Sequence, residues 1–395
     1  MIMNKVGIVA VTYKDNFGSA LQTYATQYVL AKLGYDPYIF NINGIHKLVN
    51  AKKVFFFLKS YFVLGEKKYL FENLKSRSRK KISSSGDKYA QNMKIRHQKY
   101  VEFNEKWFNM LPPKKTWSGL ESQAQTMEAV VVGSDQLWRP SNIEGGYFTL
   151  EFVPDEVKKI ALSTSFGVPV LPEFIWKHAR KFLNRIEYIS VRENSGANII
   201  KDITGREVLV ACDPTMLLTA KEWMCIQTEK PLVEGKYILC YFMGDDPKHR
   251  DFVRRLKTAT GYKIVGLLHG ATYVAIDEGF ADEEPYNIGP SEFINLIRNA
   301  EYMCTDSFHG TVFSILNRTS FFSFRRDSED SIASTNDRLH TLLDWTGLAD
   351  RMLVGDENIE DCISKRIDFE EVHKKVAFRR NETMEFFENA LKSKK

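Results

Sequence analysis

The sequence predicts an α/β protein with two doubly wound domains and a cleft between them. The chain has 395 residues, whereas a single hydrophobic core usually stops growing at about 250–300 residues. Short apolar runs of strand length alternate with stretches of helical length, as in sheets of parallel strands. Polar clusters follow several of these runs, and ligands of open α/β sheets bind at the carboxyl ends of the strands. The candidate site is therefore expected at those strand ends.

The first half of the chain is predicted to contain six strands. Residues 6–11 are a continuous apolar run, which is typical of a strand buried on both faces of a parallel sheet. A helix follows at residues 19–34, and Gly34 supplies its C-terminal stop. The other strands are predicted at residues 38–42, 129–132, 160–163, 188–191 and 208–210, with helices at 173–185 and 193–201.

The second half repeats this alternation. Its strands are predicted at residues 237–242, 263–266, 302–304 and 320–322, and its helices at 248–260, at 290–299 and from about His309 onward. We predict domains at residues 1–212 and 213–368, with the break between 213 and 236. The last segment, residues 369–395, is predicted to be a helix long enough to cross back onto the first domain.

The composition is that of a globular chain and favours the cytoplasm. Apolar residues make up 44% of the chain and charged residues 27%. The apolar run at residues 6–11 is too short for a secretory signal, and no stretch approaches the roughly 20 apolar residues of a membrane span. Five cysteines without a CxxC pair or a His at zinc-ligand spacing predict reduced, packed thiols and no metal site.

The net charge of +5 conceals one basic insert at residues 47–99. This segment contains about 15 Lys and Arg against three acids, so it carries roughly +12 and the rest of the chain roughly −7. Its aromatic stretch at residues 54–62 suggests an amphipathic helix at a membrane surface or over an anionic glycolipid. A solvated basic face over core aromatics explains it equally well. Nucleic acid is not expected as a partner, because no binding motif accompanies the charge.

His309 is the first candidate for catalysis. It follows the strand at residues 302–304 and begins a helix, where backbone N–H groups and the positive helix end attract anions. An imidazole can also donate or accept a proton near neutral pH. The alternative is a helix start capped by Asp306 or Ser307, with His309 merely packed.

The turn after the first strand contains small residues that allow close approach of a ligand. Asn16, Gly18 and Ser19 occupy it, but they form neither a GxGxxG motif nor a P-loop with its Lys, so dinucleotide and Walker-type phosphate binding lose support. A simple turn with Ser19 as the helix cap is the alternative.

The strand at residues 129–132 is followed by side chains suited to a sugar. Ser134, Asp135, Gln136 and Trp138 combine a hydroxyl, a carboxylate, an amide and an indole, and a pyranose offers apolar C–H faces together with hydroxyl edges. A capped turn with a packed Trp138 is the alternative.

Two arginines are candidates for anion binding. Arg192 ends the strand at residues 188–191 and could clamp a carboxylate or phosphate through two hydrogen bonds. Arg338 lies in the group at residues 336–340 that begins a helix. The alternative for Arg192 is an ordinary ion pair with a nearby acid. The alternative for Arg338 is a helix start without a role in binding.

The chain resembles the polysaccharide pyruvyl transferase family over roughly residues 5–350. The resemblance rests on six segments in order; the basic insert and the chain after about residue 355 are not part of it. These segments are 16–22 (NFGSALQ), 133–138 (GSDQLW), 163–167 (STSFG), 190–193 (SVRE), 213–215 (DPT) and 305–310 (TDSFHG).

The resemblance implies a GT-B-like fold, in which two Rossmann-like domains face each other across a cleft. It also implies transfer of pyruvate from phosphoenolpyruvate, a co-substrate, onto two hydroxyls of one sugar to form a cyclic ketal, with no cofactor. The first domain would then bind the acceptor and the second the donor. The basic insert, which lies outside the resemblance, suggests a lipid-pyrophosphate-linked acceptor at the inner membrane face. Some members carry an Arg two residues before the His. Here that position is Ser307, and Arg338 is the predicted replacement.

The predicted roles fall into three groups. His309 is expected to be the general acid, Arg192 an electrostatic clamp, and Asp135 a base or hydroxyl acceptor. Ser307, Gly310 and Arg338 are expected at the donor. The residues expected at the acceptor are Asn16, Gly18, Ser19, Ser134, Gln136, Trp138 and Ser165.

Two other functions fit the same pattern. One is a nucleotide-sugar glycosyltransferase of the same fold, with Glu283 or Glu284 holding the ribose. The other is a non-catalytic glycan or membrane-surface binding protein. The joint presence of His309, Arg192 and Asp135 argues against the second.

Overall fold

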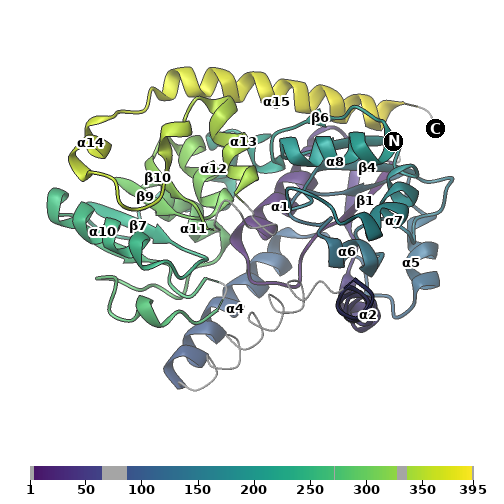
Figure 1. Cartoon of the computed structure of the whole chain (residues 1–395), viewed down its shortest axis with the longest axis horizontal. Coiled ribbons are helices and arrows are strands. Elements are labelled where there is room, and N and C mark those ends of the chain that lie inside the picture. The colour runs from purple at the N-terminus through teal and green to yellow at the C-terminus, as the bar shows by residue number, and fades with distance from the viewer. Residues whose placement is uncertain (1–3, 65–86, 271, 327–335, 394–395) are drawn as a thin grey trace.

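Two parallel β-sheets flanked by helices form the protein (Figure 1). The computed structural model describes residues 4–64, 87–270, 272–326 and 336–393. All strand pairs within the two sheets are parallel. The predicted α/β class with two doubly wound sheets is therefore confirmed.

The first sheet has six strands in the order β2-β1-β3-β4-β5-β6. Its central strands are almost fully buried, because helices cover both faces and apolar side chains pack on each. The strands are β1 (Lys5–Val9), β2 (Asp36–Ile39), β3 (Ala129–Val132), β4 (Lys158–Thr164), β5 (Tyr188–Val191) and β6 (Leu209–Val210). The helices of this half are α1 (Phe17–Lys32), η1 (Ile42–Gly44), α2 (His46–Leu64), α4 (Asp87–Trp107), α5 (Trp117–Ala124), α6 (Pro140–Gly145), α7 (Glu173–Leu183) and α8 (Asn194–Thr204).

The second sheet has five strands in the order β11-β10-β9-β7-β8. They are β7 (Tyr237–Tyr241), β8 (Lys263–Gly266), β9 (Tyr302–Thr305), β10 (Ser320–Phe324) and β11 (Met352–Leu353). The short helices η3 (Pro214–Met216), α9 (Ala220–Trp223) and η4 (Met224–Ile226) precede it. The other helices are α10 (Pro247–Thr260), η5 (Ala275–Asp277), α11 (Pro290–Arg298), α12 (Phe308–Asn317), α13 (Asp337–Thr346), η6 (Ala349–Arg351), α14 (Ile359–Ser364) and α15 (Phe369–Lys392).

The two halves are packed together through α1, which contacts both α11 and α12. The ring of Phe17, at the start of α1, stacks on Phe293 of α11 with 4.5 Å between centroids. One hydrophobic core extends from residues of the first sheet, such as Val6, to residues of the second, such as Leu239. The carboxyl ends of β1 and β9, each followed by a helix start, therefore lie close together.

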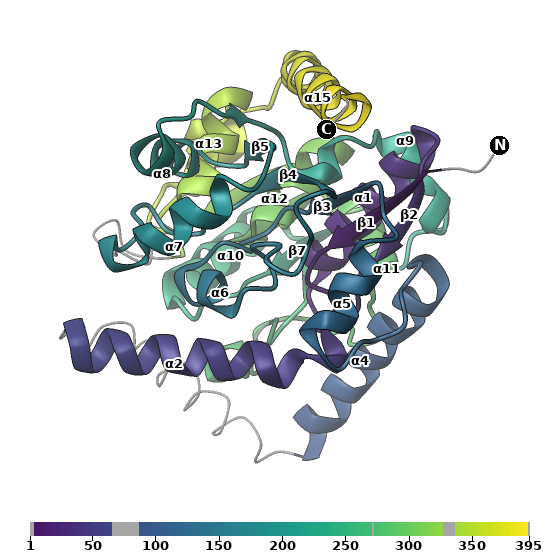
Figure 2. The same ribbon diagram turned by 90° about the vertical axis from the view of Figure 1, so that its right-hand side faces the viewer.

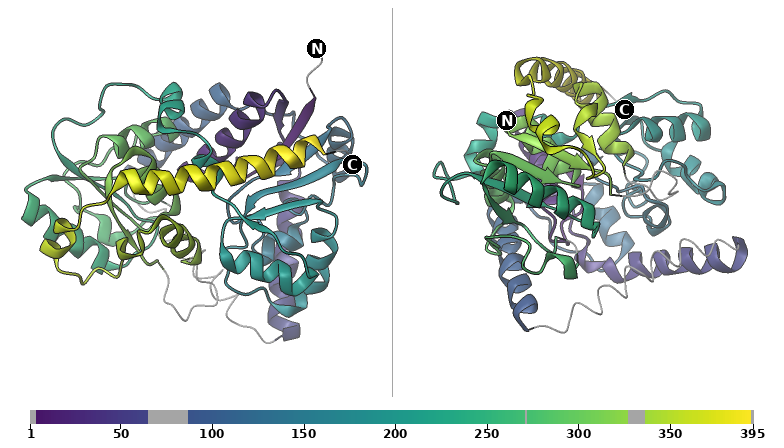
Figure 3. Two further views of the ribbon diagram at one scale, coloured as in Figure 1. Left: turned by 90° about the horizontal axis from the view of Figure 1, so that it is seen from above. Right: turned by 60° about the vertical axis from the view of Figure 1, so that its left-hand side comes forward.

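The C-terminal helix α15 crosses from the second half back to the first, as predicted (Figure 3). Near its start, His373 Nε2 lies 2.8 Å from the carbonyl oxygen of Ile315 in α12. Near its end, Lys158 Nζ of β4 donates a 2.7 Å hydrogen bond to the carbonyl oxygen of Leu391. The predicted domain boundary near residue 213 falls between β6 and β7 and stays a prediction.

The basic insert contributes two long helices, and its residues 65–86 lie outside the described part of the chain. Helix α2 packs on α6, and α4 packs on α11 of the second half. Figure 2 shows α2 at the periphery of the molecule and α4 beside α11. Among the described residues, no helix is long and apolar enough to cross a membrane.

Candidate active site

Two helix starts bring the candidate residues together at the carboxyl ends of the strands. Asn16 caps α1, and its side chain accepts a 3.0 Å hydrogen bond from the backbone N–H of Ser19. Ser307 caps α12, accepting from the N–H of Gly310 at 3.4 Å. Ser307 and Gly310 thus build the turn that holds His309, the second residue of α12.

Asp213 is the centre of a buried polar network. Its Oδ2 accepts hydrogen bonds of 2.7 Å from Ser134 Oγ and from Arg192 Nη1. His309 Nε2 lies 3.5 Å from the same oxygen. The other carboxylate oxygen accepts from the backbone N–H and the hydroxyl of Thr215 at 3.0 and 2.7 Å. One carboxylate therefore connects side chains that follow β3, β5 and β9.

The charge state of Asp213 follows from its neighbours. Burial alone would raise the pKa of this carboxyl group, but His309 and Arg192 outweigh burial and hold the pKa well below its ordinary value. Asp213 is therefore a carboxylate at neutral pH.

Asp135 lies at the edge of this network. Its backbone has a φ of 90°, a conformation that costs a non-glycine residue about 1–3 kcal/mol and occurs mainly at functional sites. Its Oδ2 accepts a 2.5 Å hydrogen bond from Ser19 Oγ, and its Oδ1 lies 3.9 Å from Arg192 Nη2. Burial raises the pKa of Asp135, but the charges of Arg192 and His309 bring it below its ordinary value. The group is thus better suited to accept a hydroxyl hydrogen bond than to remove a proton.

Three arginines surround the turn before α12. The guanidinium of Arg192, a residue only 3% exposed, lies 4.4 Å from the ring centroid of Phe308, and that of Arg338 lies 5.9 Å from the same ring. Arg326, after β10, donates a 2.7 Å hydrogen bond to the carbonyl oxygen of Asp306. Burial and the charges of Arg192 and Arg326 lower the pKa of Arg338 to about 9, which leaves it a cation at neutral pH.

Unsatisfied buried polar atoms gather at this site. Within the described residues, the following buried atoms make no hydrogen bond: Arg192 Nε and Nη2, His309 Nε2, Glu193 Oε2 and Arg326 Nε. Leaving such a group unpaired costs about 1–3 kcal/mol each. Three of these atoms are guanidinium nitrogens, and several donors without a hydrogen bond in one place are the pattern expected of a surface that hydrogen-bonds an anionic ligand.

The imidazole of His309 packs directly on Gly18. A Cβ atom added to Gly18 would lie 1.9 Å from His309 Nδ1, so only glycine allows this approach. The residue His309 is 6% exposed. The two halves of the protein therefore meet at the imidazole, and little of it is exposed to solvent.

Three of the predicted acceptor residues have mainly structural contacts. Trp138 is 0% exposed; its indole N–H donates to the carbonyl oxygen of Phe148 at 3.1 Å and its rings pack on Phe166 and Phe182. A residue enclosed in this way belongs to the core, contrary to the expectation that it contacts a sugar.

Gln136 and Ser165 support the local backbone. Gln136 accepts a hydrogen bond from Arg139 Nη1 at 3.1 Å and packs against Gly167. The hydroxyl of Ser165, which is fully buried, accepts from the N–H of Gly167 at 3.1 Å. The remaining acceptor candidates, Asn16, Gly18, Ser19 and Ser134, do lie in the network around His309 and Asp135.

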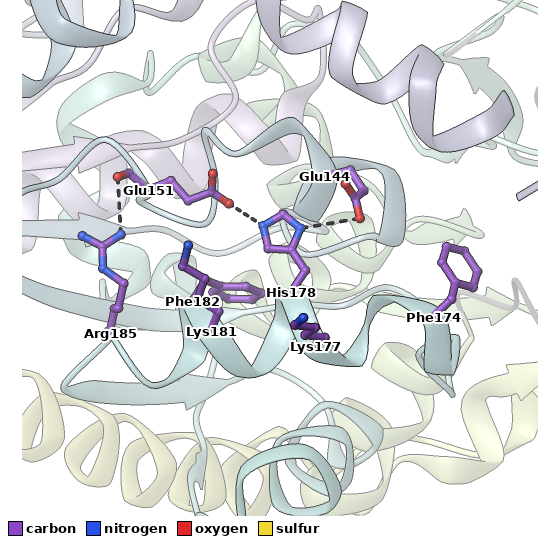
Figure 4. Close-up of a pocket in the computed structure, with 8 residues that line it drawn as sticks. All are labelled: Glu144, Glu151, Phe174, Lys177, His178, Lys181, Phe182 and Arg185. Carbon is purple, nitrogen blue, oxygen red and sulfur yellow. Dashed lines mark hydrogen bonds and ion pairs between the residues drawn. The ribbon is translucent and has the colours of Figure 1, made fainter. Parts of the chain in front are cut away.

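A separate cavity of about 540 Å³ lies between α6 and α7, and none of the predicted site residues lines it (Figure 4). His178 lies between two carboxylates there, with Nε2 2.5 Å from Glu151 and Nδ1 3.5 Å from Glu144. Its hydrogen bonds to Glu144 and Glu151 raise the pKa of His178 to about 9. A charged His178 therefore joins α7 to α6 and to the following loop.

Sequence reasoning missed Asp213, Arg326 and Glu193 as site residues. Asp213 and Glu193 lie in two of the six segments that carry the family resemblance, and each is the second or third residue after a strand, which was the available signal. Arg326 likewise follows a strand end, two residues after β10, but only the pairing of β10 with β9 brings it to Asp306. Within the described residues, no group of three or more His, Cys, Asp or Glu side chains could hold a metal ion.

Two parallel sheets with a polar site at their adjoining carboxyl ends define an α/β protein of the GT-B class. A UDP-N-acetylglucosamine 2-epimerase structure from Listeria monocytogenes is similar in fold, with a TM-score of 0.52 at 11% identity over 98% of this chain and 96% of that one. A glycosyltransferase from Rickettsia africae gives a TM-score of 0.49 at 11% identity over 100% of both chains. No curated protein matches the chain.

The sequence assigns the protein to one family among those that share this fold. The family of polysaccharide pyruvyl transferases matches residues 16–328, and the chain belongs to that family. The family membership implies a transferase. It also confirms the resemblance inferred from the six segments, and residues 16–328 include the turn at Asn16 and the helix start at His309.

Proposed function

We propose that the protein transfers pyruvate from phosphoenolpyruvate to two hydroxyls of a sugar in a polysaccharide or its precursor, forming a cyclic ketal and releasing phosphate. The observation that carries the proposal is the grouping of an imidazole with buried guanidinium nitrogens that lack hydrogen-bond partners among the described residues. Phosphoenolpyruvate carries a carboxylate and a phosphate, both of which suit guanidinium donors. Its enol carbon needs a proton donor, which a histidine can supply.

The chemistry divides into three steps. His309 delivers a proton to the CH₂ carbon of phosphoenolpyruvate, which becomes the methyl group, and the adjacent carbon becomes electrophilic. A sugar hydroxyl then forms a bond to that carbon and gives up its proton to the imidazole. The second hydroxyl of the same sugar forms the other C–O bond and displaces phosphate, which leaves with the remaining proton.

The surrounding residues have distinct tasks in these steps. Arg192 and Arg326 hold the carboxylate and phosphate, and Arg338 adds positive charge behind Phe308. The carboxylate of Asp213, 3.5 Å from His309 Nε2, orients the imidazole. Asp135, oriented by Ser19, accepts a hydrogen bond from the attacking hydroxyl. These charges are fixed before the reaction, so little reorganisation is needed in the transition state.

The direct test is to identify which donor is consumed. The protein is incubated with a panel of galactosides and other glycosides, together with phosphoenolpyruvate in one series and nucleotide sugars in another. We expect phosphate release and a product heavier by one pyruvate ketal, detected by mass spectrometry, only in the first series. Glycosyl transfer in the second series would favour a nucleotide-sugar glycosyltransferase, and binding of glycans without turnover of any donor would favour a non-catalytic protein.

We further propose that the insert docks the enzyme on an anionic membrane surface, where a lipid-linked acceptor would reside. Three apolar side chains of α2 are 45–46% exposed: Leu48, Val54 and Leu58. Lys52 of the same helix is also exposed, so α2 presents both apolar and cationic side chains to solvent. Such a helix binds by burying apolar area and by attraction to acidic lipids.

Replacing Leu48 and Leu58 together by Glu is expected to weaken binding to vesicles with acidic lipids at least about tenfold, since two apolar contacts are lost and two like charges are added. Vesicle co-sedimentation measures this. Turnover of a water-soluble acceptor should be unchanged, and the double substitution of Val170 and Leu232, exposed elsewhere, serves as the control. Equal binding by both variants would exclude α2 as the docking face.

A further inference from the structure

Helix α4 of the basic insert connects the two halves of the protein. At its C-terminal end, the carbonyl oxygen of Trp107 accepts a 2.7 Å hydrogen bond from Gln27 of α1. In its middle, Tyr100 stacks on Phe17 with 5.3 Å between centroids, and Lys99 packs against Gly289 at the start of α11. The insert therefore reaches the carboxyl edge of the second sheet, beside α11 (Figure 2).

Arg96 is the cation that α4 brings to this edge. The residue is only 5% exposed, and its Nη1 donates to the carbonyl oxygen of Leu268, just after β8, at 2.8 Å. Its Nε and Nη2 are buried and make no hydrogen bond, and it forms no salt bridge with a carboxylate among the residues that the structure describes. The guanidinium lies 5.0 Å from the ring centroid of Tyr286. A buried charge with two unused donors needs compensation, which an anion would supply.

Arg96 lies one helical turn before Tyr100, whose ring stacks on Phe17, the neighbour of Gly18 in the candidate active site. Tyr241, at the carboxyl end of β7, is the common neighbour: its ring lies 5.4 Å from Phe17 of α1. Burial raises the pKa of Tyr241 to about 12, and the charges of Arg96 and Arg326 act on it in the opposite direction. The cation from the insert and the cation after β10 therefore both act on the same hydroxyl group.

The loop that Arg96 holds has an unusual backbone and aromatic side chains. His269 has a φ of 54°, a left-handed conformation that is rare for histidine, and its ring stacks on Tyr273 at 4.9 Å. Five acidic residues lie between β8 and α11, and three of them are near His269 or Tyr286. Arg250 holds Asp277 through hydrogen bonds of 2.8 and 3.0 Å, and Glu278, largely exposed, lies 3.6 Å from His269. Glu284 is the third, near Tyr286.

We propose that Arg96 forms a second anion subsite, which binds a phosphate or diphosphate ester on the acceptor. This inference rests on the proposed function, because it assigns the acceptor's charged group to the edge of β7 and β8 while the donor occupies the site at His309. The Tyr286 ring and the backbone of Leu268 and His269 fix the guanidinium, so its free nitrogens are oriented in advance. The acceptor's diphosphate can come from a nucleotide sugar or from a lipid carrier.

The test measures binding of inorganic pyrophosphate, uridine diphosphate and farnesyl diphosphate by titration calorimetry, with phosphoenolpyruvate present in saturating amounts. We expect Arg96→Met to weaken pyrophosphate binding at least about tenfold, the loss typical of one charge-assisted hydrogen bond, and to leave phosphoenolpyruvate affinity unchanged. Arg96→Lys should weaken it about threefold or more, because an ammonium cannot replace two planar donors. The matched control is Arg254→Met, since Arg254 is an exposed cation stacked on Phe280 at 5.5 Å.

The outcomes separate clearly. Tighter binding of uridine diphosphate would identify a nucleotide sugar as the source of the diphosphate. Tighter binding of farnesyl diphosphate would identify a lipid carrier. If pyrophosphate binds Arg96→Met as well as the unchanged protein, or if phosphoenolpyruvate displaces it, the subsite is wrong. If Arg96→Met does not fold, the test relies on Arg96→Lys. Pyrophosphate binding by Arg96→Lys that is as tight as that of the unchanged protein contradicts the subsite. Binding of diphosphates without any binding of phosphoenolpyruvate would overturn the proposed donor and leave the subsite standing.

Discussion

Replacing His309 with Gln is expected to slow phosphate release from phosphoenolpyruvate by about 10²–10⁴-fold, the usual contribution of a general acid. Glutamine keeps a polar side chain of similar length at the second position of α12 but cannot donate a proton to carbon. The affinity for phosphoenolpyruvate should change little, because the guanidinium groups of Arg192 and Arg326 remain. Single-turnover phosphate release and equilibrium donor binding together measure the two effects.

A matched control shows that the effect belongs to the site. His373→Gln removes another partly buried histidine, which lies 2.8 Å from a backbone carbonyl at the α15–α12 contact, and its turnover should stay near that of the unchanged protein. Near-normal phosphate release by His309→Gln would exclude His309 as the acid. If His309→Gln loses donor affinity and turnover to the same extent, His309 would instead contribute to donor binding and not to proton transfer.

Much of the fold could be predicted because strand and helix signals agree along the chain. The strand predicted at residues 6–11 overlaps β1 (Lys5–Val9), and the predicted strand at 263–266 coincides with β8. The predicted bounds of α10 and α11 differ from the structure by one residue at an end, and the last helix, predicted at residues 369–395, begins as predicted and ends at Lys392. The two-residue strand β11 was not predicted, since Met352 and Leu353 carry no periodic pattern and their pairing with β10 depends on the second sheet being formed.

The candidate site could be predicted only in part, because the position of a residue after a strand does not determine where its side chain points. Strand ends brought His309, Arg192 and Asp135 to one region, and these three do lie around Asp213. Trp138 has the same local signal, but its ring points into the core beside Phe166. The choice of Arg338 as the cation near Ser307 missed Arg326, whose approach to Asp306 depends on strand pairing distant in sequence.

Replacing Asp213 with Asn is expected to lower the free energy of unfolding by about 3–5 kcal/mol, the loss typical of breaking a buried ion pair from one side. Asparagine has nearly the same shape, but it leaves the buried guanidinium of Arg192 and the imidazole of His309 without their common counter-ion. Urea denaturation measures the change. Asp155→Asn is the control, because Asp155 is 82% exposed in its pair with Arg185 and should contribute less than about 1 kcal/mol.

The pH dependence of the loss in unfolding free energy shows whether the charge of Asp213 or its packing causes the loss. Because the pKa of Asp213 is lowered in the folded protein, its charge stabilises the fold above the ordinary carboxyl pKa of about 3.9. That contribution declines as the pH falls toward the folded-state pKa. The difference in unfolding free energy between the unchanged protein and Asp213→Asn should therefore be constant from pH 7 to about pH 5. It should decrease by about 1 kcal/mol by pH 3. A difference independent of pH would mean that packing, and not the carboxylate charge, holds Arg192 and His309 in place.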